Sequence, residues 1–182
     1  MSNNSNQSPD FTGFNAWNSD PFLQLTAQEL PESVKAGIAS HGAWAGRAET
    51  NKLARMANIN VPALHTHNAN GDRQDEVEFH PAWHALMRKG VEAGLHSSLW
   101  TRQAAEAEMH NLARSARVFI SSGVEMGHLC PLMMTSASVP VLMKHKELSN
   151  EWLPKLLARK YDFSNRPVSA KSGITIGMAM TE

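Results

Sequence analysis

The stretch AEAEMHNLARSARVFISSGVEMG, residues 105–127, is the longest periodic run in the chain. Its apolar and small residues recur at steps of three and four, the spacing that gathers side chains on one face of an α-helix. They are Met109, Leu112, Ala113, Ala116, Phe119, Ile120 and Gly123. We therefore predict a long helix with one buried face. Because several of these residues are small, a neighbouring helix is expected to pack closely against it.

Two helical segments are predicted after this run. Pro131 interrupts the pattern, and residues 131–146 (PLMMTSASVPVLMKHK) are nearly all apolar, which predicts a helix through the middle of the bundle. Residues 149–161 (SNEWLPKLLARKY) open with Ser149 or Asn150 as the predicted N-cap. The inner face of that helix is predicted to carry Trp152, Leu153, Leu156 and Leu157.

Four helical segments are predicted before the run. Asp20 is the predicted N-cap of a helix whose first residue is Pro21, and Pro31 opens a second segment over 32–44. Apolar residues at steps of three and four mark the other two segments: Leu53, Met56 and Ala57 within 48–58, and Trp83, Leu86, Met87 and Val91 within 81–100.

The helical pattern fails in two places. The excursion near 60–79 contains Pro62 and the turn signal Asn70-Gly71-Asp72 with alternation on either side, which predicts a hairpin. The last residues, SGITIGMAMTE (172–182), are small or β-branched and predict a strand. A single strand has no partner, so we expect its sheet to belong to a β-domain that the sequence does not include.

The predicted fold class is all-α, a bundle of about five or six helices with the excursion and one orphan β-strand at the C-terminus. Residues 1–13 are rich in Asn and Ser and are expected to form a disordered tail. The helical domain is predicted over 14–163. Residues 164–182 are predicted as a linker and the first strand of a truncated β-domain.

The composition of the chain argues against several classes of function. The chain has 182 residues, enough for one domain, and its 17 basic and 17 acidic residues leave no net charge to attract nucleic acid or anionic lipid. The basic bias over 144–171 is interpreted as a solvated face. One Cys excludes an internal disulfide, and the polar start MSNNSNQSPD lacks the parts of a signal peptide. We expect a cytoplasmic protein with no membrane partner.

Two chemical hypotheses arise from the residues themselves. His80 and His84 are four apart, close enough on a helix to share a metal, and His65 and His67 are possible further ligands. The favoured interpretation is structural, with His80 capping a helix or packing beside an aromatic ring, so no metal ligand is predicted.

A Cys nucleophile is the second hypothesis, since Cys130 lies near His128 in the sequence. The apolar surroundings LCPLMM favour instead a buried, inert thiol. We therefore predict no catalytic residue in this chain.

Three segments carry a resemblance to a known family. They are LARMANINVPALHTHNANGDRQDEVEFHPAWHALM (53–87), VEMGHLCPLMMT (124–135) and GITIGMAMTE (173–182). In order and spacing they resemble the N-terminal region of the AidB group within the acyl-CoA dehydrogenase superfamily. The resemblance covers roughly residues 14–182.

The resemblance implies an architecture and a cofactor. Such flavoproteins have an N-terminal helical domain, a middle β-domain and a C-terminal helical domain, and they bind FAD between the last two. The closing M-T-E is similar to the start of the family's M-T-E-x-x-G-G-S-D segment, which wraps the flavin. Met180, Thr181 and Glu182 are accordingly the expected FAD-binding residues, with Thr181 the most direct contact through its hydroxyl or its backbone N–H.

The resemblance also implies that this chain lacks parts of the family protein. The G-G-S-D continuation, most of the FAD pocket and the catalytic base would follow Glu182, so this chain alone is expected to lack catalysis. In the full-length protein we expect FAD-dependent oxidation of an acyl-CoA-like substrate (a CH–CH donor), an adaptive response to alkylation damage and a homo-oligomer. DNA binding is expected only through the missing C-terminal domain. The alternative hypothesis is a stand-alone helical module that oligomerises or binds a partner.

Overall fold

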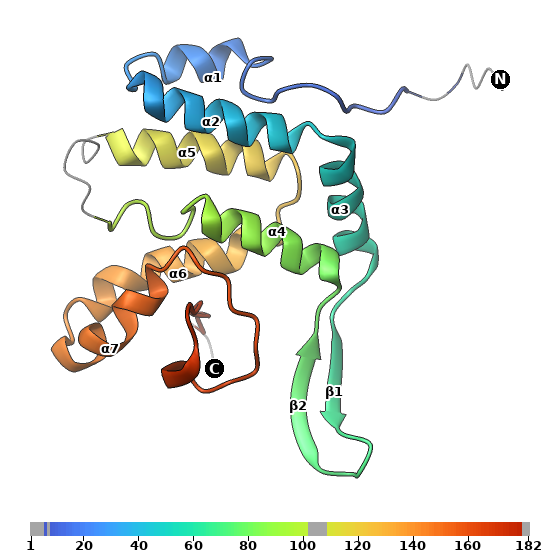
Figure 1. Ribbon diagram of the computed structural model, residues 1–182, viewed down its shortest axis with the longest axis vertical. Helices are drawn as coiled ribbons and strands as arrows, with labels where there is room; N and C mark the ends of the chain where they lie inside the picture. The colour runs from blue at the N-terminus through green and yellow to red at the C-terminus, as the bar shows by residue number, and fades with distance from the viewer. Residues whose placement is uncertain (1–5, 7, 102–108, 180–182) are drawn as a thin grey trace.

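The computed structural model describes residues 6, 8–101 and 109–179, and this part of the chain is mostly helical (Figure 1). In chain order its elements are α1 (Pro21–Thr26), α2 (Glu32–Ala45), α3 (Ala48–Ile59), β1 (Ala63–His67), β2 (Arg73–Glu78), α4 (Pro81–Glu92), α5 (His110–Ser122), α6 (Leu129–Leu142), α7 (Lys146–Leu156) and a short 3₁₀ turn (Val168–Ala170). The predicted all-α class with a hairpin in the excursion is confirmed. None of the described helices is long and apolar enough to span a membrane.

Two hydrophobic clusters hold the helices together. The first joins α1, α2 and α5, which lie side by side in Figure 1, and consists of Trp17, Leu23, Ala27, Leu30, Val34, Ile38, Ala113, Ala116 and Ile120. The second joins α4 to α6 through Met87, Val91, Leu95, Leu129 and Leu132. Gly90 allows that approach, because a Cβ at this position would lie 2.5 Å from Leu132 Cδ1.

The predicted helix starts at Asp20 and His80 are confirmed by their hydrogen bonds. Asp20 Oδ1 accepts from the backbone N–H of Leu23 at 2.9 Å, and Pro21 occupies the first helical position. His80 Nδ1 accepts from the N–H of Ala82 at 3.1 Å, with Pro81 following. Each acceptor satisfies a backbone donor that the first turn of a helix leaves without an intrahelical partner.

The central periodic run forms α5 from His110, and the predicted residues before Met109 lie outside the described part. Ala113, Ala116 and Ile120 are buried as predicted, but Phe119 is 58% exposed. The prediction for Phe119 was wrong because α1 and α2 cover only part of the apolar stripe.

The helix α6 differs from its prediction in position. It begins at Leu129, two residues before Pro131, and it is buried on one face only. Val141 and Met143 are more than half exposed, so the predicted place in the middle of the bundle is wrong. The cause is its position between α4 and α7, which leaves its outer face without a covering helix among the described residues.

The helix α7 begins at Lys146, so the predicted N-cap at Ser149 or Asn150 is wrong. The N–H of Ser149 already donates to the carbonyl of His145 at 2.8 Å, which places Ser149 within the first turn. Leu156 is buried on the predicted inner face.

The excursion forms an antiparallel hairpin that projects away from the helices (Figure 1). Ala63 pairs with Glu78, Leu64 with Val77 and His65 with Glu76, and the register shifts before His67 pairs with Arg73. The shift coincides with Asp75, whose φ of +47° is unusual for a residue with a side chain.

The predicted C-terminal strand is not present over residues 173–179, which join no sheet in the described part of the chain. β-structure requires a hydrogen-bonded partner strand, and the described sheet contains only β1 and β2. The predicted boundary between the helical domain and the linker, at residue 163, stays a prediction.

Candidate functional site

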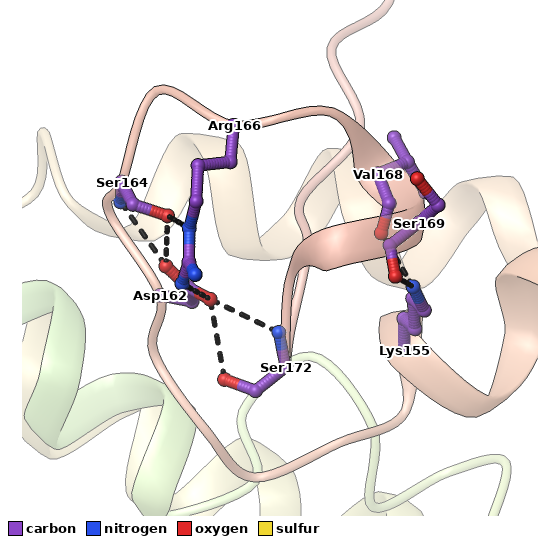
Figure 2. A network of polar contacts seen from close by, with 7 residues as sticks. All are labelled: Lys155, Asp162, Ser164, Arg166, Val168, Ser169 and Ser172. Atoms are coloured by element: carbon purple, nitrogen blue, oxygen red, sulfur yellow. Dashed lines mark hydrogen bonds and ion pairs between the residues drawn. The ribbon is translucent and has the colours of Figure 1, made fainter.

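The candidate site is built by the segment 157–179, here called the exit loop, which leads from α7 toward the predicted FAD-binding residues. The Asp162 carboxylate is the centre of a network of hydrogen bonds within this loop (Figure 2). The Oδ1 atom accepts from the Ser164 N–H at 3.1 Å and from its hydroxyl at 2.6 Å. The Oδ2 atom accepts from the Ser172 N–H at 3.0 Å and from Arg166 at 3.4 Å. One carboxylate thus ties together both halves of the loop.

These bonds stabilise the ionised form of Asp162. The hydroxyl of Ser164 and then the N–H groups of Ser172 and Ser164 hold the pKa of this carboxyl well below its usual range, and the charge of Arg166 adds to the effect. Asp162 therefore stays a carboxylate at neutral pH and serves as an acceptor in the loop.

Lys155 on α7 anchors the 3₁₀ turn of the exit loop. Its ammonium donates to the carbonyl of Val168 and, at 2.8 Å, to that of Ser169 (Figure 2). Charge-assisted hydrogen bonds of this kind are stronger than neutral ones. The turn is thereby held against the helix that precedes it.

Residues 173–176 contact other parts of the chain at three points. Gly173 is buried so closely that a Cβ would lie 2.0 Å from the carbonyl oxygen of Lys160. The N–H of Ile174 donates to the carbonyl of Lys155 at 3.3 Å, and the N–H of Ile176 donates to Thr135 Oγ1 on α6 at 3.0 Å. Residues 173–176 are therefore positioned by both α6 and α7, four residues before Met180.

Two cavities adjoin the exit loop. One, of about 430 Å³, lies between the loop and α7 and includes His96, Trp152 and Lys160 in its lining. The other, of about 740 Å³, lies between the loop, the first turns of α4 and the base of the hairpin. Both are lined in part by Tyr161, Asp162, Lys171 and Thr175.

Aromatic rings and a hydrogen bond connect the exit loop to α4. Tyr161 Oη and His84 Nδ1 are 2.7 Å apart, and the Phe163 ring lies 4.6 Å from that of His84. Phe79 stacks on Trp83 at 4.1 Å on the same wall of the larger cavity. Burial raises the pKa of Tyr161 to about 12 and lowers that of His84. At neutral pH the pair consists of a phenol and a neutral imidazole, joined by one hydrogen bond whose direction is set by the tautomer of the imidazole.

The predicted FAD-binding residues Met180, Thr181 and Glu182 lie outside the described residues. Their position stays a prediction, and the structure describes the chain only to Ala179.

The four histidines in the metal hypothesis have hydrogen-bond partners within the protein. His80 caps α4, His84 pairs with Tyr161, and His65 contacts Glu78 at 2.8 Å. Within the part of the chain that the structure describes, no three His, Cys, Asp or Glu side chains gather as a metal site would require.

Cys130 is exposed, so its predicted burial is wrong. It lies in the first turn of α6 on the side away from the core, whereas His128 is fully buried and its Nδ1 contacts Glu125 Oε2 at 2.9 Å. The imidazole is thus paired with a carboxylate, and the Cys–His hypothesis receives no support from this arrangement.

Asp162 and Thr135 were missed by the sequence reasoning. Asp162 was given no role, and the residues from 164 onward were interpreted only as a linker and a strand, although Asp followed two residues later by Ser is a common local turn pattern. Thr135 is an ordinary helix residue in the sequence, and its bond to Ile176 spans 41 positions. No local signal identifies it.

The architecture matches the helical N-terminal part of acyl-CoA dehydrogenases. The structure superposes on ACDH-11 of Caenorhabditis elegans in complex with C11-CoA with a TM-score of 0.70 at 24% identity, covering 87% of this chain and 28% of that one. It also superposes on the apo form of Bd2924 with a TM-score of 0.69 at 22% identity, covering 84% of this chain and 31% of that one. At these identities the likeness establishes the fold.

Sequence comparison establishes the family. A profile described as the adaptive response protein AidB N-terminal domain matches residues 6–163, and the chain belongs to that family. It is 40% identical to AidB of Escherichia coli (strain K12) over 146 residues, which is 80% of this chain and 27% of that protein. It is 28% identical to acyl-CoA dehydrogenase family member 11 of C. elegans over 155 residues, 80% of this chain and 25% of that protein. The chain spans about a quarter of the length of these curated relatives.

Proposed function

We propose that this chain is the N-terminal helical part of an FAD-dependent, acyl-CoA dehydrogenase-type flavoprotein, in which Met180, Thr181 and Glu182 contact the flavin. The observation that carries the proposal is the anchoring of residues 173–176 on Thr135 of α6 and Lys155 of α7. Family membership supports it over residues 6–163.

In this proposal the helical domain acts as a positioning scaffold. The Asp162 network and the Lys155 contacts hold the exit loop, and the anchored backbone then delivers the M-T-E segment to one place relative to α6 and α7. Fixing the backbone in advance lowers the entropy lost when a cofactor binds. FAD, when bound, supplies hydride acceptance, while the residues of this chain orient the flavin.

The substrate class in the proposal is an acyl-CoA-type thioester. One structural relative is described in complex with C11-CoA, which supports the class for that protein. Oxidation of such a thioester requires a base within hydrogen-bond reach of its α-proton, and we assign no residue of this chain to that role. The chain by itself is therefore proposed to lack catalysis, and a cytoplasmic homo-oligomer is proposed for the longer protein.

The first experiment is equilibrium dialysis of the 182-residue chain against FAD. We expect binding no tighter than about 100 µM, because most of the pocket is proposed to lie in other segments. A yellow, stoichiometric complex that survives gel filtration would refute that part of the proposal.

The second experiment tests the M-T-E contact in a chimera. Residues 1–182 replace the aligned N-terminal quarter of E. coli AidB, and flavin content is measured beside that of the parent. We expect Thr181→Ala to weaken FAD retention roughly tenfold, as for loss of a hydrogen bond worth about 1.4 kcal/mol, and Thr26→Ala, at an exposed position of α1 that lines neither cavity, to leave it unchanged. Equal retention in the two variants would contradict a contact through the Thr181 hydroxyl.

A further inference from the structure

The smaller of the two cavities beside the exit loop, of about 430 Å³, is lined by more positive than negative charge. Its lining contains the cations Lys160, Arg166 and Lys171 and a single carboxylate, that of Asp162. The chain as a whole has no net charge, so the excess is local. The basic bias over 144–171, which the sequence suggested to be a solvated face, therefore includes three side chains that the fold gathers around one cavity.

The contacts of the exit loop bring these cations to one place. Arg166 and the backbone N–H of the residue after Lys171 both donate to Asp162 Oδ2, at 3.4 Å and 3.0 Å (Figure 2). The carbonyl of Lys160 lies directly against Gly173. The loop thus closes on itself, and residues separated in the sequence line the same cavity.

The carboxylate of Asp162 leaves most of this positive charge unpaired. Its oxygens already accept from two serines and from Arg166. The side chains of Lys160 and Lys171 form no ion pair or hydrogen bond with any residue that the structure describes. Arg166 donates through Nε to Ser164 and through one terminal nitrogen to Asp162, which leaves other N–H groups of its five for a ligand. Arginine and lysine donors of this kind bind phosphate groups strongly.

A buried histidine adds a hydrogen-bond acceptor to the same lining. His96 is 2% exposed, and its Nε2 lies 3.1 Å from the carbonyl oxygen of Ala158. Because a carbonyl oxygen only accepts, Nε2 carries the proton and Nδ1 is an acceptor. Nδ1 has no hydrogen-bond partner in the described part of the chain. Burial, opposed by the bond to Ala158 and reinforced by the charges of Arg159 and Arg114, lowers the pKa of His96 to about 4, so the ring is neutral at pH 7.

The charges and the acceptor together define the chemistry of a ligand. The cations require a negative group, and His96 Nδ1 requires a hydroxyl or N–H donor close to it. A phosphomonoester of a sugar carries both, because its phosphate has a charge between −1 and −2 at neutral pH and its hydroxyl groups are donors. Val91 and Trp152 supply apolar surface for the carbon skeleton, and the volume falls within the range of small-molecule sites.

We propose that this cavity binds a phosphorylated sugar, with the phosphate on Lys160, Arg166 and Lys171 and a hydroxyl group donating to His96 Nδ1. Two sources of this chemistry are a free sugar phosphate and the 3′-phosphorylated ribose of coenzyme A. The site is separate from the flavin contact proposed for residues 180–182 and does not depend on it, because FAD carries no phosphomonoester.

The first test is isothermal titration calorimetry of the 182-residue chain with ribose 5-phosphate, and with ribose and inorganic phosphate as its two parts. We expect a dissociation constant on the order of 0.1–1 mM for ribose 5-phosphate, binding of inorganic phosphate weaker by about fivefold or more, and no binding of ribose at about 10 mM. In NMR spectra the amides of Lys160 and Lys171 and the ring of His96 should shift. Shifts confined to other residues would overturn the proposal, and inorganic phosphate binding as tightly as ribose 5-phosphate would overturn the hydroxyl contact.

The second test uses charge variants of matched chemistry. Lys160→Gln/Lys171→Gln removes two charges from the cavity, and Lys144→Gln/Lys146→Gln removes two from the same basic segment but outside the cavity lining. Circular dichroism checks that the helices are retained in each. At about 0.1 M salt, which screens distant charges, we expect the cavity variant to weaken binding of ribose 5-phosphate more than tenfold and the control less than twofold. Equal effects would overturn the proposal, because net charge alone would then explain the binding.

Coenzyme A and dephospho-coenzyme A, which differ only in the 3′-phosphate, distinguish the two sources. Coenzyme A binding about tenfold tighter than both dephospho-coenzyme A and ribose 5-phosphate would support the proposal with coenzyme A as the ligand. Ribose 5-phosphate binding at least as tightly as coenzyme A would support it with a free sugar phosphate. Absence of binding by both coenzyme A and ribose 5-phosphate at about 10 mM would overturn it, whatever the affinity of the chain for FAD.

Discussion

Tyr161 Oη and His84 Nδ1 lie 2.7 Å apart and join the exit loop to the first turn of α4. Because Tyr161 is the only tyrosine in the chain, its ionisation can be followed without interference. Burial raises its pKa to about 12, against the lowering effect of Arg88. Ionisation removes the proton of the phenol and leaves a phenolate oxygen opposite His84 Nδ1.

The first prediction concerns this phenol. Titration of the native chain followed by absorbance near 295 nm should show ionisation about 2 pH units above the value of about 10 for a free tyrosine. In denaturant the midpoint should return to about 10. A native midpoint near 10 would show that Tyr161 is freely exposed to water, contrary to its place between α4 and the exit loop.

The second prediction concerns Gly173. Alanine at this position would place a Cβ against the carbonyl of Lys160, and backbone cannot move aside as a side chain does. We expect Gly173→Ala to lower the free energy of unfolding by about 1–3 kcal/mol, or to release the exit loop with faster amide exchange at Ile174 and Ile176. Gly177→Ala is the matched control, because no atom lies within 4 Å of its Cβ position. Equal stability and equal exchange in both variants would show that the close approach at Gly173 is absent.

The third prediction concerns the Asp162 carboxylate. Its native pKa lies below the ordinary value of 3.8, so its stabilisation of the loop is present in full above 3.8 and is lost as pH falls through the native value. The amide resonances of Ser164 and Ser172 should follow this titration in NMR spectra with a midpoint below 3.8. In Asp162→Asn the same amides should lose that titration and exchange several-fold faster, while Asp72→Asn in the hairpin turn should leave them unchanged. A midpoint at or above 3.8 would exclude the network as the cause.

The fourth prediction concerns acid stability. His41 Nε2 lies 2.8 Å from Ser121 Oγ between α2 and α5, and burial, followed by the nearby charges, lowers its pKa to about 3. Burial likewise lowers the pKa of His96 to about 4. The unfolded chain therefore binds these protons at a higher pH than the native chain does, so stability is present in full above about 6.5 and falls as pH drops toward 4.

Urea unfolding at a series of pH values measures this effect. Each histidine contributes a slope of at most about 1.4 kcal/mol per pH unit in the window. His41→Gln retains a hydrogen-bonding group opposite Ser121 and should reduce the slope by about one such contribution. His67→Gln in the exposed hairpin should leave the slope as it is. A slope unchanged by His41→Gln would mean that His41 is protonated in the native state.

Local sequence patterns predicted most elements of the fold. The stripe at Leu86, Met87 and Val91 is buried where the spacing of three and four placed it, and the Asp20 cap begins α1 as expected. The hairpin follows from the turn residues near Asn70 and Gly71. These features depend on neighbours within a few positions, so the chain itself carries the information.

Most of the candidate site could not be predicted from local sequence patterns. Its central acceptor, Asp162, gathers groups up to ten positions away, and Thr135 meets Ile176 only after the chain has passed through α7. The same holds for the errors at Phe119 and Cys130, which are apolar or small residues in apolar surroundings and are nevertheless exposed.

By itself, the sequence determined the helices, their apolar faces, the hairpin and the family resemblance, because periodicity, capping and turn residues act locally. The tertiary structure decided which apolar faces find a neighbour and where the exit loop is held. The physical reason is that burial depends on what packs against a face. That is set by contacts between segments far apart in the sequence, such as α5 against α1 and α2, and residues 173–176 against α6 and α7.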